Sequence, residues 1–258
     1  MIRTPLPAPP PDLPALFSPF LRDAILYDSS CSPQARVYFL DKDDGYYLKR
    51  SPKGTLEREA RLTRYFHDLG LGAEVLAYHS LDEDWLLTRR LAGEDLTHPS
   101  YLADPKRLCD TLSERLAYLH ALPCDGCPLI HKTAYFAIAE TNYRAGRFDP
   151  SYADNPDLTP ETAWQAVETG KHRLASDTLL HGDYCLPNLL FSDWAFSGLI
   201  DLGNGGIGDR HVDLFWGAWT LRYNLKTDAF RQRFFDGYGR DRIDPERLRL
   251  IGMIETFG

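Results

Sequence analysis

The chain has 258 residues, 43% of them hydrophobic and 26% charged, values that are ordinary for a globular protein with one large or two modest domains. The net charge of −8 argues against a nucleic acid polymer as partner, because such binding needs a positive footprint, and it is compatible with a cationic small substrate. No apolar run is long enough to cross a bilayer, so we expect no membrane partner.

The first 15 residues are rich in proline and have no apolar core of the kind that a signal peptide needs. We predict a semi-extended arm, with a disordered tail as the equal alternative. Five cysteines in a chain without an export signal indicate a reducing cytoplasm. Cys124 and Cys127 have redox or half-zinc spacing, but no second close pair exists, so we interpret them as part of a structural loop.

A β-rich segment with one helix follows the arm. The run 56–69 has a helical period, with Leu56, Leu62 and Phe66 on one side, and it stops at Gly70. Strand-like runs flank this helix at residues 36–40, 45–50, 75–78 and 85–88. This order predicts a small antiparallel sheet with one main helix against it.

Beyond residue 93 the pattern becomes helical. Asp104 and Pro105 form a good helix start, and leucines follow at helical spacing from Leu108 to Leu119. We expect further helices at residues 135–147, 159–175, 210–223, 228–238 and 245–255. The sequence therefore predicts two lobes with a boundary near residues 89–93 and a ligand cleft between them.

The strongest motif lies in residues 179–201. Asp183 and Asn188 are separated by four residues, as in the catalytic loop H-R-D-x-x-x-x-N of protein kinases. Two strand-like runs, 188–191 and 196–202, then lead to Asp201, where a kinase keeps a second metal-binding acid. Asp183 is the predicted general base, while Asn188 and Asp201 offer oxygen ligands for Mg²⁺. The motif predicts phosphoryl transfer from a magnesium nucleotide.

Lys49 ends a predicted strand and can reach nucleotide phosphates from a rigid element. The alternative is an ordinary solvated lysine. Glu59 lies on the apolar side of the following helix, and a carboxylate there needs a partner because a lone buried charge is costly. We expect Lys49 to be that partner, with a local pair to Arg58 or Thr63 as the alternative.

Two further residues are predicted to support the catalytic loop. His181 stands two residues before Asp183, and we prefer a structural role for it over a catalytic one. Asp213 opens an apolar helix, and we expect it to accept hydrogen bonds from the loop backbone. A plain interaction with the helix dipole is the alternative for Asp213.

Together these motifs resemble the aminoglycoside 3′-phosphotransferases, antibiotic kinases with a protein-kinase-like fold. The resemblance is carried by residues 32–38, 47–49, 57–59, 181–188, 196–203, 208–213 and 254–257. It implies an α+β, bilobal fold. Residues 1–93 would form a nucleotide-binding N-lobe with a hinge near 89–93, and residues 94–258 a helical C-lobe with the catalytic loop and the acceptor site.

The resemblance also implies roles for the nucleotide side, with ATP or GTP and Mg²⁺ as cofactors. The residues it assigns are Ser32 for phosphate, Tyr47 for adenine stacking, Lys49 and Glu59 for the α- and β-phosphates, and the backbone from Arg89 to Leu91 for the base edge. Asp183 would be the base, and Asn188 and Asp201 the metal ligands. No G-x-G-x-x-G loop is present, and this family also lacks one.

The chain departs from the family pattern on the acceptor side. Asn204 stands where the family usually has arginine, and Tyr223 and Asn224 stand where it tends to offer two acids. An aminoglycoside is a polycation, so this change reshapes its recognition. The candidate acceptor residues are Asp149, Asp154, Asp157, Asn204, Tyr223, Asn224, Glu255 and Phe257. The loop that carries the first three could equally be an exposed polar turn.

We therefore predict a cytoplasmic ATP-dependent kinase, a monomer or weak dimer, that phosphorylates a hydroxyl of an aminoglycoside, most simply of the 3′ type. One alternative is a kinase of the same fold acting on another hydroxylated small molecule. The other is a catalytically silent nucleotide-binding module. The intact set Lys49, Glu59, Asp183, Asn188 and Asp201 argues against the silent module, which need not keep all five.

Overall fold

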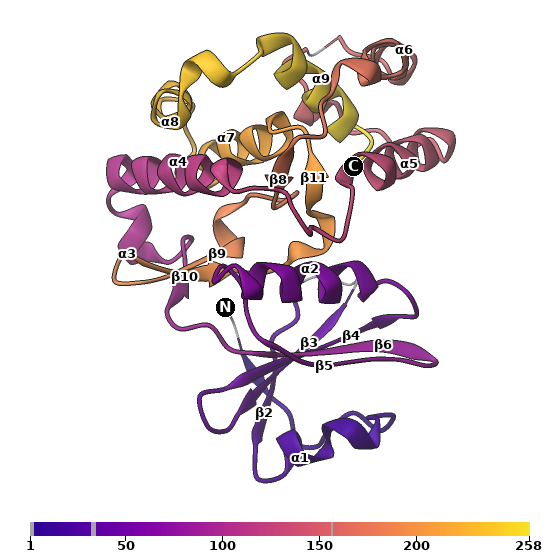
Figure 1. The fold of residues 1–258 in the computed structure, drawn as a ribbon, viewed down its shortest axis with the longest axis vertical. Helices are drawn as coiled ribbons and strands as arrows, with labels where there is room; N and C mark the ends of the chain where they lie inside the picture. The colour runs from indigo at the N-terminus through magenta and orange to yellow at the C-terminus, as the bar shows by residue number, and fades with distance from the viewer. Residues whose placement is uncertain (1–2, 32–34, 156) are drawn as a thin grey trace. The chain divides into compact units, whose positions relative to one another are not determined.

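The computed structural model describes residues 3–31, 35–155 and 157–258. The chain divides into two compact units (Figure 1). Unit 1 consists of Met1–Gly93 and Leu190–Gly203, and unit 2 of Glu94–Leu189 and Asn204–Gly258. The functional division into lobes made from the sequence stays a prediction, and each unit is described by itself.

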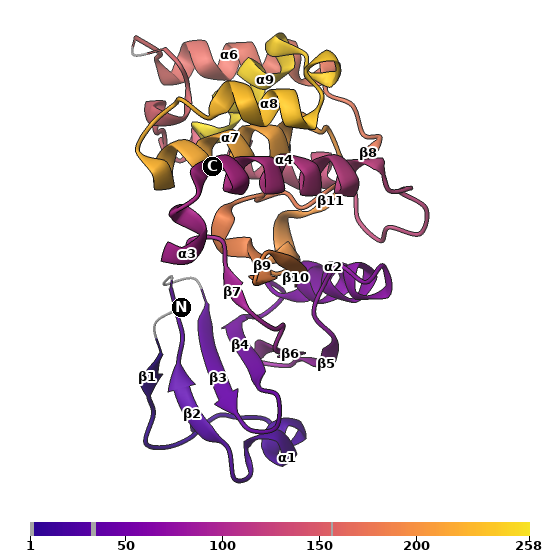
Figure 2. The same ribbon diagram turned by 90° about the vertical axis from the view of Figure 1, so that its left-hand side faces the viewer.

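Unit 1 contains a six-stranded antiparallel sheet in the order β1-β2-β3-β4-β6-β5 (Figure 2). Its strands are β1 Thr4–Pro5, β2 Ile25–Asp28, β3 Arg36–Asp41, β4 Tyr46–Pro52, β5 Val75–Ser80 and β6 Glu83–Arg89. The one long helix of this unit in the described residues is α2, Glu57–Asp68. The predicted antiparallel sheet with one main helix is therefore confirmed, and it has two more strands than expected.

The two faces of this sheet bury different partners, because side chains alternate along a strand. One face packs a core around Phe17, Leu40, Leu48 and Trp85. On the other face Leu86 packs against the first turns of α2. Lys49 pairs directly with Leu86 across β4 and β6, so its side chain belongs to the α2 face.

The N-terminal arm is part of this unit. β1 pairs with β2 at the edge of the sheet, and a short 3₁₀ turn, Ala15–Phe17, leads into α1, Ser18–Leu21. Phe17 is fully buried. From residue 3 onward the arm thus contributes an edge strand and a buried aromatic ring to this unit.

Unit 2 is mainly helical. Its helices are α3 Pro99–Leu102, α4 Pro105–Ala121, α5 His131–Arg144, α6 Pro160–Gly170, α7 His211–Leu225, α8 Arg231–Tyr238 and α9 Pro245–Glu255. The cap residues read from the sequence act as expected: Asp104 accepts from the backbone of Arg107, and Thr159 forms a capping box with Thr162. Between residues 3 and 258, leaving out the gaps, no helix combines the length and apolarity needed to cross a membrane.

The core of unit 2 lies among α5, α6, α7 and α9. Its buried residues include Ala139, Val167, Val212, Ile251 and Phe257. A two-stranded antiparallel ladder of β8, Thr178–Leu180, and β11, Gly206–Gly208, stands beside these helices. The loop that begins at His181 directly follows β8 of this ladder.

The hairpin after this loop consists of β9, Leu189–Ser192, and β10, Ala195–Leu199. Its turn residues Asp193 and Trp194 both have positive φ, 48° and 65°, as a two-residue type I′ turn requires. The predicted strands are confirmed in kind, but the second ends at Leu199, because Asp201 adopts the left-handed conformation with φ of 57°.

Candidate active site

Unit 1 assembles a compact charge cluster on the α2 face of its sheet. Lys49 Nζ lies 2.6 Å from Glu59 Oε1 and also pairs with Asp201 Oδ1. Lys49 comes from β4, Glu59 from α2, and Asp201 from the segment after β10. The side chains of Lys49 and Glu59 are 20% and 13% exposed, whereas that of Asp201 is 46% exposed. The expected pair of Lys49 with Glu59 is confirmed.

Electrostatics keep this lysine charged. Burial alone would lower the pKa of Lys49, but the carboxylates of Asp201 and Glu59 outweigh it and raise the pKa above its ordinary value. Two carboxylates share one ammonium, so the cluster carries an excess negative charge. Carboxylate oxygens with excess negative charge suit a hard divalent cation, and Asp201, the more exposed acid, fits the role of such a ligand.

The other residues of unit 1 that were predicted to bind the nucleotide differ in their contacts within the protein. Tyr47 lies two residues before Lys49 on β4 and therefore on the same face. Arg89 is tied to Glu74 by a 2.8 Å ion pair. Across the described segments, no backbone hydrogen bond involves Leu91, so its amide and carbonyl can serve a ligand. Ser32 lies outside the described residues.

Unit 2 holds the loop with the predicted base. The Asn188 side-chain nitrogen donates to the Asp183 backbone carbonyl at 2.9 Å and to Asp183 Oδ2 at 3.0 Å. These two bonds fix the rotamer of Asp183 and the orientation of the Asn188 amide. The nitrogen makes both bonds, which leaves the Asn188 oxygen as the donor atom that Mg²⁺ prefers.

The backbone of this loop is held by one buried acid. Asp213 accepts hydrogen bonds from the amides of His181 and Gly182, both at 2.8 Å. The Asp213 carboxylate is fully buried. Burial raises its pKa, but the hydrogen bonds from His120 and from the loop amides outweigh burial, so the pKa of Asp213 is lowered. The predicted role of Asp213 as acceptor for the loop is confirmed.

Sequence reasoning missed the residues behind Asp213. His120 Nε2 lies 3.1 Å from Asp213 Oδ2, and its Nδ1 lies 2.9 Å from the Tyr238 hydroxyl. Burial lowers the pKa of His120, which favours a neutral imidazole bridging the two. The loop is thus connected through α7 to α4 and α8. No spacing rule relates His120, Asp213 and Tyr238 in the sequence. The one local signal is that His120 lies in the last turn of an apolar helix.

A glycine is required within the loop. Gly182 has a φ of 83°, and a Cβ built there would lie 2.1 Å from the Asn204 carbonyl oxygen. Both facts exclude a side chain at this position. The Asn204 backbone therefore lies directly against Gly182, the residue before Asp183. Asn204 itself is an exposed residue.

Among the candidate acceptor acids, Glu255 is the one that lies buried in unit 2. It accepts from the Tyr135 hydroxyl at 2.7 Å and from Trp216 Nε1 at 3.1 Å. Burial raises its pKa to about 7, with a smaller contribution from the negative charge of Asp183. Glu255 can therefore change its protonation state near neutral pH.

Two of the three loop acids are engaged with the protein itself. Asp149 accepts from the Ser151 amide at 2.9 Å, and this bonding lowers its pKa. Asp154 forms a 3.1 Å ion pair with Arg231. Asp157 is exposed. A cationic ligand would have to share or displace Arg231 in order to use Asp154.

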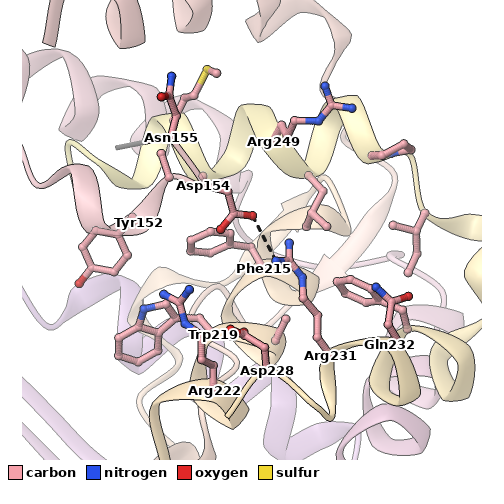
Figure 3. Close-up of a pocket in the computed structure, with 18 of the residues that line it drawn as sticks. Tyr152, Asp154, Asn155, Phe215, Trp219, Arg222, Asp228, Arg231, Gln232 and Arg249 are labelled. Carbon is pink, nitrogen blue, oxygen red and sulfur yellow. Dashed lines mark hydrogen bonds and ion pairs between the residues drawn. The ribbon is translucent and has the colours of Figure 1, made fainter. Parts of the chain in front are cut away.

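The ion pair of Asp154 and Arg231 crosses a cavity of about 480 Å³ (Figure 3). The cavity lies where α7, α8 and α9 meet the short 3₁₀ turn Pro150–Tyr152. Its lining combines aromatic rings with arginines and two acids: Tyr152, Phe215, Trp219, Phe235, Arg222, Arg231, Arg240, Arg249, Asp154 and Asp228. Most of its charged lining is basic, which disfavours a polycation inside it.

An aromatic row continues from Tyr152 toward the end of α7. Tyr152 and Trp219 have ring centroids 6.1 Å apart, and Trp219 stacks on Tyr223 at 4.9 Å with an interplanar angle of 11°. Tyr223 is 56% exposed. Asn224 turns away and donates to the Thr220 carbonyl at 2.8 Å. Phe257 is fully buried among aromatic rings, so its ring cannot stack on a ligand.

Over residues 3–31, 35–155 and 157–258, no three His, Cys, Asp or Glu side chains form a group that could hold a metal. Cys124 and Cys127 are free thiols in a segment without helix or strand. Amide, backbone, water and ligand oxygens also bind Mg²⁺. Asn188 and the phosphates of a nucleotide are donors of this kind.

Comparison with known proteins supplies the family. Residues 33–251 match the family model described as the phosphotransferase enzyme family. A protein of Lactococcus lactis subsp. lactis named "Probable aminoglycoside 3′-phosphotransferase" is 49% identical over 241 residues, which cover 92% of each chain. An aminoglycoside 3′-phosphotransferase of Niallia circulans is 30% identical over 182 residues, 67% of each chain.

Solved structures agree in fold. The crystal structure of an aminoglycoside-3′-phosphotransferase of type VIII superposes with a TM-score of 0.73 and 22% identity, covering 95% of this chain and 100% of that one. The structure of aminoglycoside phosphotransferase APH(3″)-Id from Streptomyces rimosus in complex with ADP and streptomycin superposes with a TM-score of 0.70 and 22% identity, covering 86% and 90%. These likenesses confirm the bilobal α+β kinase-like fold.

Proposed function

Since this chain belongs to the aminoglycoside phosphotransferase family, we propose that it transfers the γ-phosphate of ATP to a hydroxyl of an aminoglycoside antibiotic and so confers resistance. It is a small-molecule kinase. The 3′ hydroxyl is the proposed site of transfer, because the relative with 49% identity carries a 3′-phosphotransferase name. ATP is a cytoplasmic nucleotide, so we place the enzyme there, as a monomer or weak dimer.

The observation that carries this proposal is that the side chains of both Lys49 and Asp183 are fixed by their neighbours. In unit 1 the Lys49 ammonium is held between Glu59 and Asp201. In unit 2 the Asp183 carboxylate is held by Asn188. A silent nucleotide-binding module would need the first arrangement but not the second, because Asp183 and Asn188 serve the transfer itself.

In this proposal each residue has one task. Lys49 binds the α- and β-phosphates, and Glu59 keeps its ammonium in place. Asp183 accepts or orients the proton of the acceptor hydroxyl. Since the phosphoryl transition state is loose, the fixed position of Asp183 matters at least as much as its basicity.

Asn188 and Asp201 are the proposed ligands of Mg²⁺, and their oxygens fit this hard ion. When bound, the metal neutralises negative charge on the transferring phosphate. ADP in the Streptomyces rimosus structure supports an adenine nucleotide as co-substrate. Tyr47, Ser32 and the backbone at Arg89 to Leu91 are the proposed contacts to the rest of the nucleotide.

Glu255 is the acceptor residue that the contacts favour most. Its carboxylate, in the same unit as Asp183, is buried and accepts from Tyr135 and Trp216, so an amino group of the acceptor would bind it by replacing one of these partners. Asp149, Asp157 and Asn204 are exposed and supply weaker contacts. Tyr223 supplies no carboxylate, and its ring already stacks on Trp219 and lies 4.3 Å from the Lys226 ammonium.

The test is a phosphotransfer assay with matched acceptors. Purified enzyme is given ATP, Mg²⁺ and either a kanamycin-type aminoglycoside, its 3′-deoxy derivative, streptomycin or a non-aminoglycoside alcohol. We expect ADP release and a phosphorylated product with the first, located at the 3′ oxygen by phosphorus NMR, and none with the 3′-deoxy derivative. Equal turnover of both would contradict 3′ transfer, and turnover of the alcohol alone would contradict the aminoglycoside.

One observation favours the second candidate, a kinase of the same fold for another hydroxylated small molecule. Asp154 is neutralised by Arg231, and no acid stands at Tyr223 or Asn224. A substrate with fewer positive charges would suit such a pocket. The acceptor panel above separates the two candidates directly.

A further inference from the structure

The N-terminal arm brings one arginine onto the sheet of unit 1. Pro5 pairs with Tyr27 across β1 and β2, and the Leu6 amide donates to the Leu26 carbonyl at 2.8 Å. Farther along the arm, Asp12 forms a 3.2 Å ion pair with Arg50 of β4. These contacts anchor the arm to the sheet, where β1 forms the edge beside β2 (Figure 2).

The register shows which face the arm presents. Pro5 is opposite Tyr27, Tyr27 is opposite Phe39, and Phe39 is opposite Tyr47. Directly opposed residues share a face, and so do residues two apart along a strand. Arg3, two residues before Pro5, therefore belongs to the face of Phe39 and Tyr47. Lys49 belongs to this face as well.

Side-chain contacts agree with the register. The Arg3 guanidinium carbon lies 3.5 Å from the centroid of the Phe39 ring, close enough to stack on it. One of its nitrogens donates to the Tyr47 hydroxyl at 2.9 Å. One side of the planar guanidinium covers Phe39, and Arg3 as a residue is exposed, so we take the opposite side as the open face.

The position relative to Lys49 indicates which part of a nucleotide would meet Arg3. Tyr47 and Lys49 are two residues apart, roughly 6.7 Å along an extended strand. Arg3 contacts Tyr47 and Phe39, so it lies at the aromatic end of this face and not at the ammonium that binds phosphate. A flat aromatic surface beside a phosphate-binding lysine suits a planar base.

We propose that Arg3 is a nucleotide-binding residue whose open face stacks on the purine base of the bound nucleotide. The inference rests on the proposed function, because it takes Lys49 as the phosphate ligand. Guanidinium groups stack well on aromatic faces, since they are planar, delocalised and weakly hydrated. The arm would thus add Arg3, next to the edge strand β1, to the surface that binds the base.

The experiment measures nucleotide binding and not turnover. The wild-type chain, Arg3→Ala and Arg64→Ala are titrated calorimetrically with ATP and, separately, with adenosine. Arg64 is an exposed arginine of α2, so its variant matches the change in charge without touching this face. We expect Arg3→Ala to weaken both ligands by the same factor, about three- to tenfold, and Arg64→Ala to leave both unchanged.

Three results would overturn the inference. Weaker ATP binding with unchanged adenosine binding would place Arg3 at the phosphates. Tighter binding by Arg3→Ala would make the arm a competitor of the nucleotide. Unchanged binding of both ligands would exclude any contact. Arg3→Lys tests stacking against charge, because it keeps the charge and loses the plane, and full recovery by lysine would contradict stacking.

The same titrations distinguish this inference from the proposed function. If the wild-type chain binds ATP and Arg3→Ala binds it equally well, only the role of Arg3 fails. If the wild-type chain binds no nucleotide, the proposed function and the role of Arg3 fail together. Circular dichroism of each variant at the titration temperature excludes loss of folding as the cause of weaker binding.

Discussion

The residues proposed to handle phosphate and those proposed to hold the acceptor are organised in opposite ways. Lys49 and Asp183 are each fixed by neighbours that leave their functional groups suited to a ligand. The acceptor candidates Asp154 and Glu255 are occupied by the protein's own arginine, tyrosine and tryptophan. An acceptor that uses Asp154 or Glu255 must therefore compete with these internal partners. Specificity for the acceptor then depends on residues other than those proposed for phosphate transfer.

Removal of the base should have the largest effect. We expect Asp183→Ala to reduce kcat by about 10²–10⁴-fold for every acceptor, because proton acceptance and orientation are lost together. Nucleotide affinity should stay unchanged, as measured by ATP titration. Asp241→Ala, at an exposed acid of the same unit, is the control. Turnover by Asp183→Ala close to that of the control would contradict the assignment.

Loss of the phosphate lysine should come next. We expect Lys49→Met to lower kcat/KM for ATP by about 10²-fold, again independently of the acceptor. It also leaves the half-buried Glu59 without its partner, which should reduce the free energy of unfolding by about 1–3 kcal/mol in urea denaturation. Lys53→Met, at an exposed lysine in the turn after β4, should change neither quantity. Normal ATP kinetics in Lys49→Met would remove this lysine from the site.

A change on the acceptor side should act selectively. Tyr223 is exposed at the end of the aromatic row, and we expect Tyr223→Glu to lower KM for a polycationic aminoglycoside by about fivefold. KM for ATP should not change. Tyr118→Glu, at an exposed tyrosine of α4, gives the same charge elsewhere in unit 2. Equal shifts in both variants would indicate only a general electrostatic attraction.

The smallest effect on activity concerns pH. With a pKa of about 7, Glu255 ionises mainly between pH 6 and 8, so affinity for an acceptor amine should rise over that range. Glu255→Gln should lose this part of the pH dependence of KM. Parallel pH profiles for the two proteins would contradict a contact between Glu255 and the acceptor.

The same carboxyl gives a stability test with the opposite trend. Its folded pKa lies above the unfolded value of 4.5, so the wild-type fold binds this proton more tightly and loses stability as pH rises through about 7. Between pH 4.5 and 8 the Gln variant should gain about 3 kcal/mol relative to wild type in urea denaturation. A pH-independent difference would show that Glu255 titrates normally.

The sequence predicted what local spacing encodes. The helical position of Glu59 indicated its inward face, and the position of Asp213 indicated a bond to the loop; the structure confirms both contacts. His120 and Asp213 are 93 residues apart, and Arg231 and Asp154 are 77 apart. No periodicity relates such polar partners, because they meet only once the helices have packed.

The sequence did not predict the strand β1 in the N-terminal arm, because of its prolines. Prolines argue against a strand, since proline lacks the amide that a ladder needs. β1 is the edge strand of its sheet, where a missing donor costs little, and Pro5 is tolerated there. Composition alone could not show that a proline-rich stretch supplies the sixth strand.

Gly182 carries no chemistry, yet its missing side chain lets the Asn204 carbonyl approach the catalytic loop. If resistance is the selected trait, a saturation library should therefore find codon 182 nearly as intolerant as codon 183. Even alanine, the smallest replacement, would force two backbone segments apart. A genetic map of the essential positions would then include one residue whose contribution is a missing side chain.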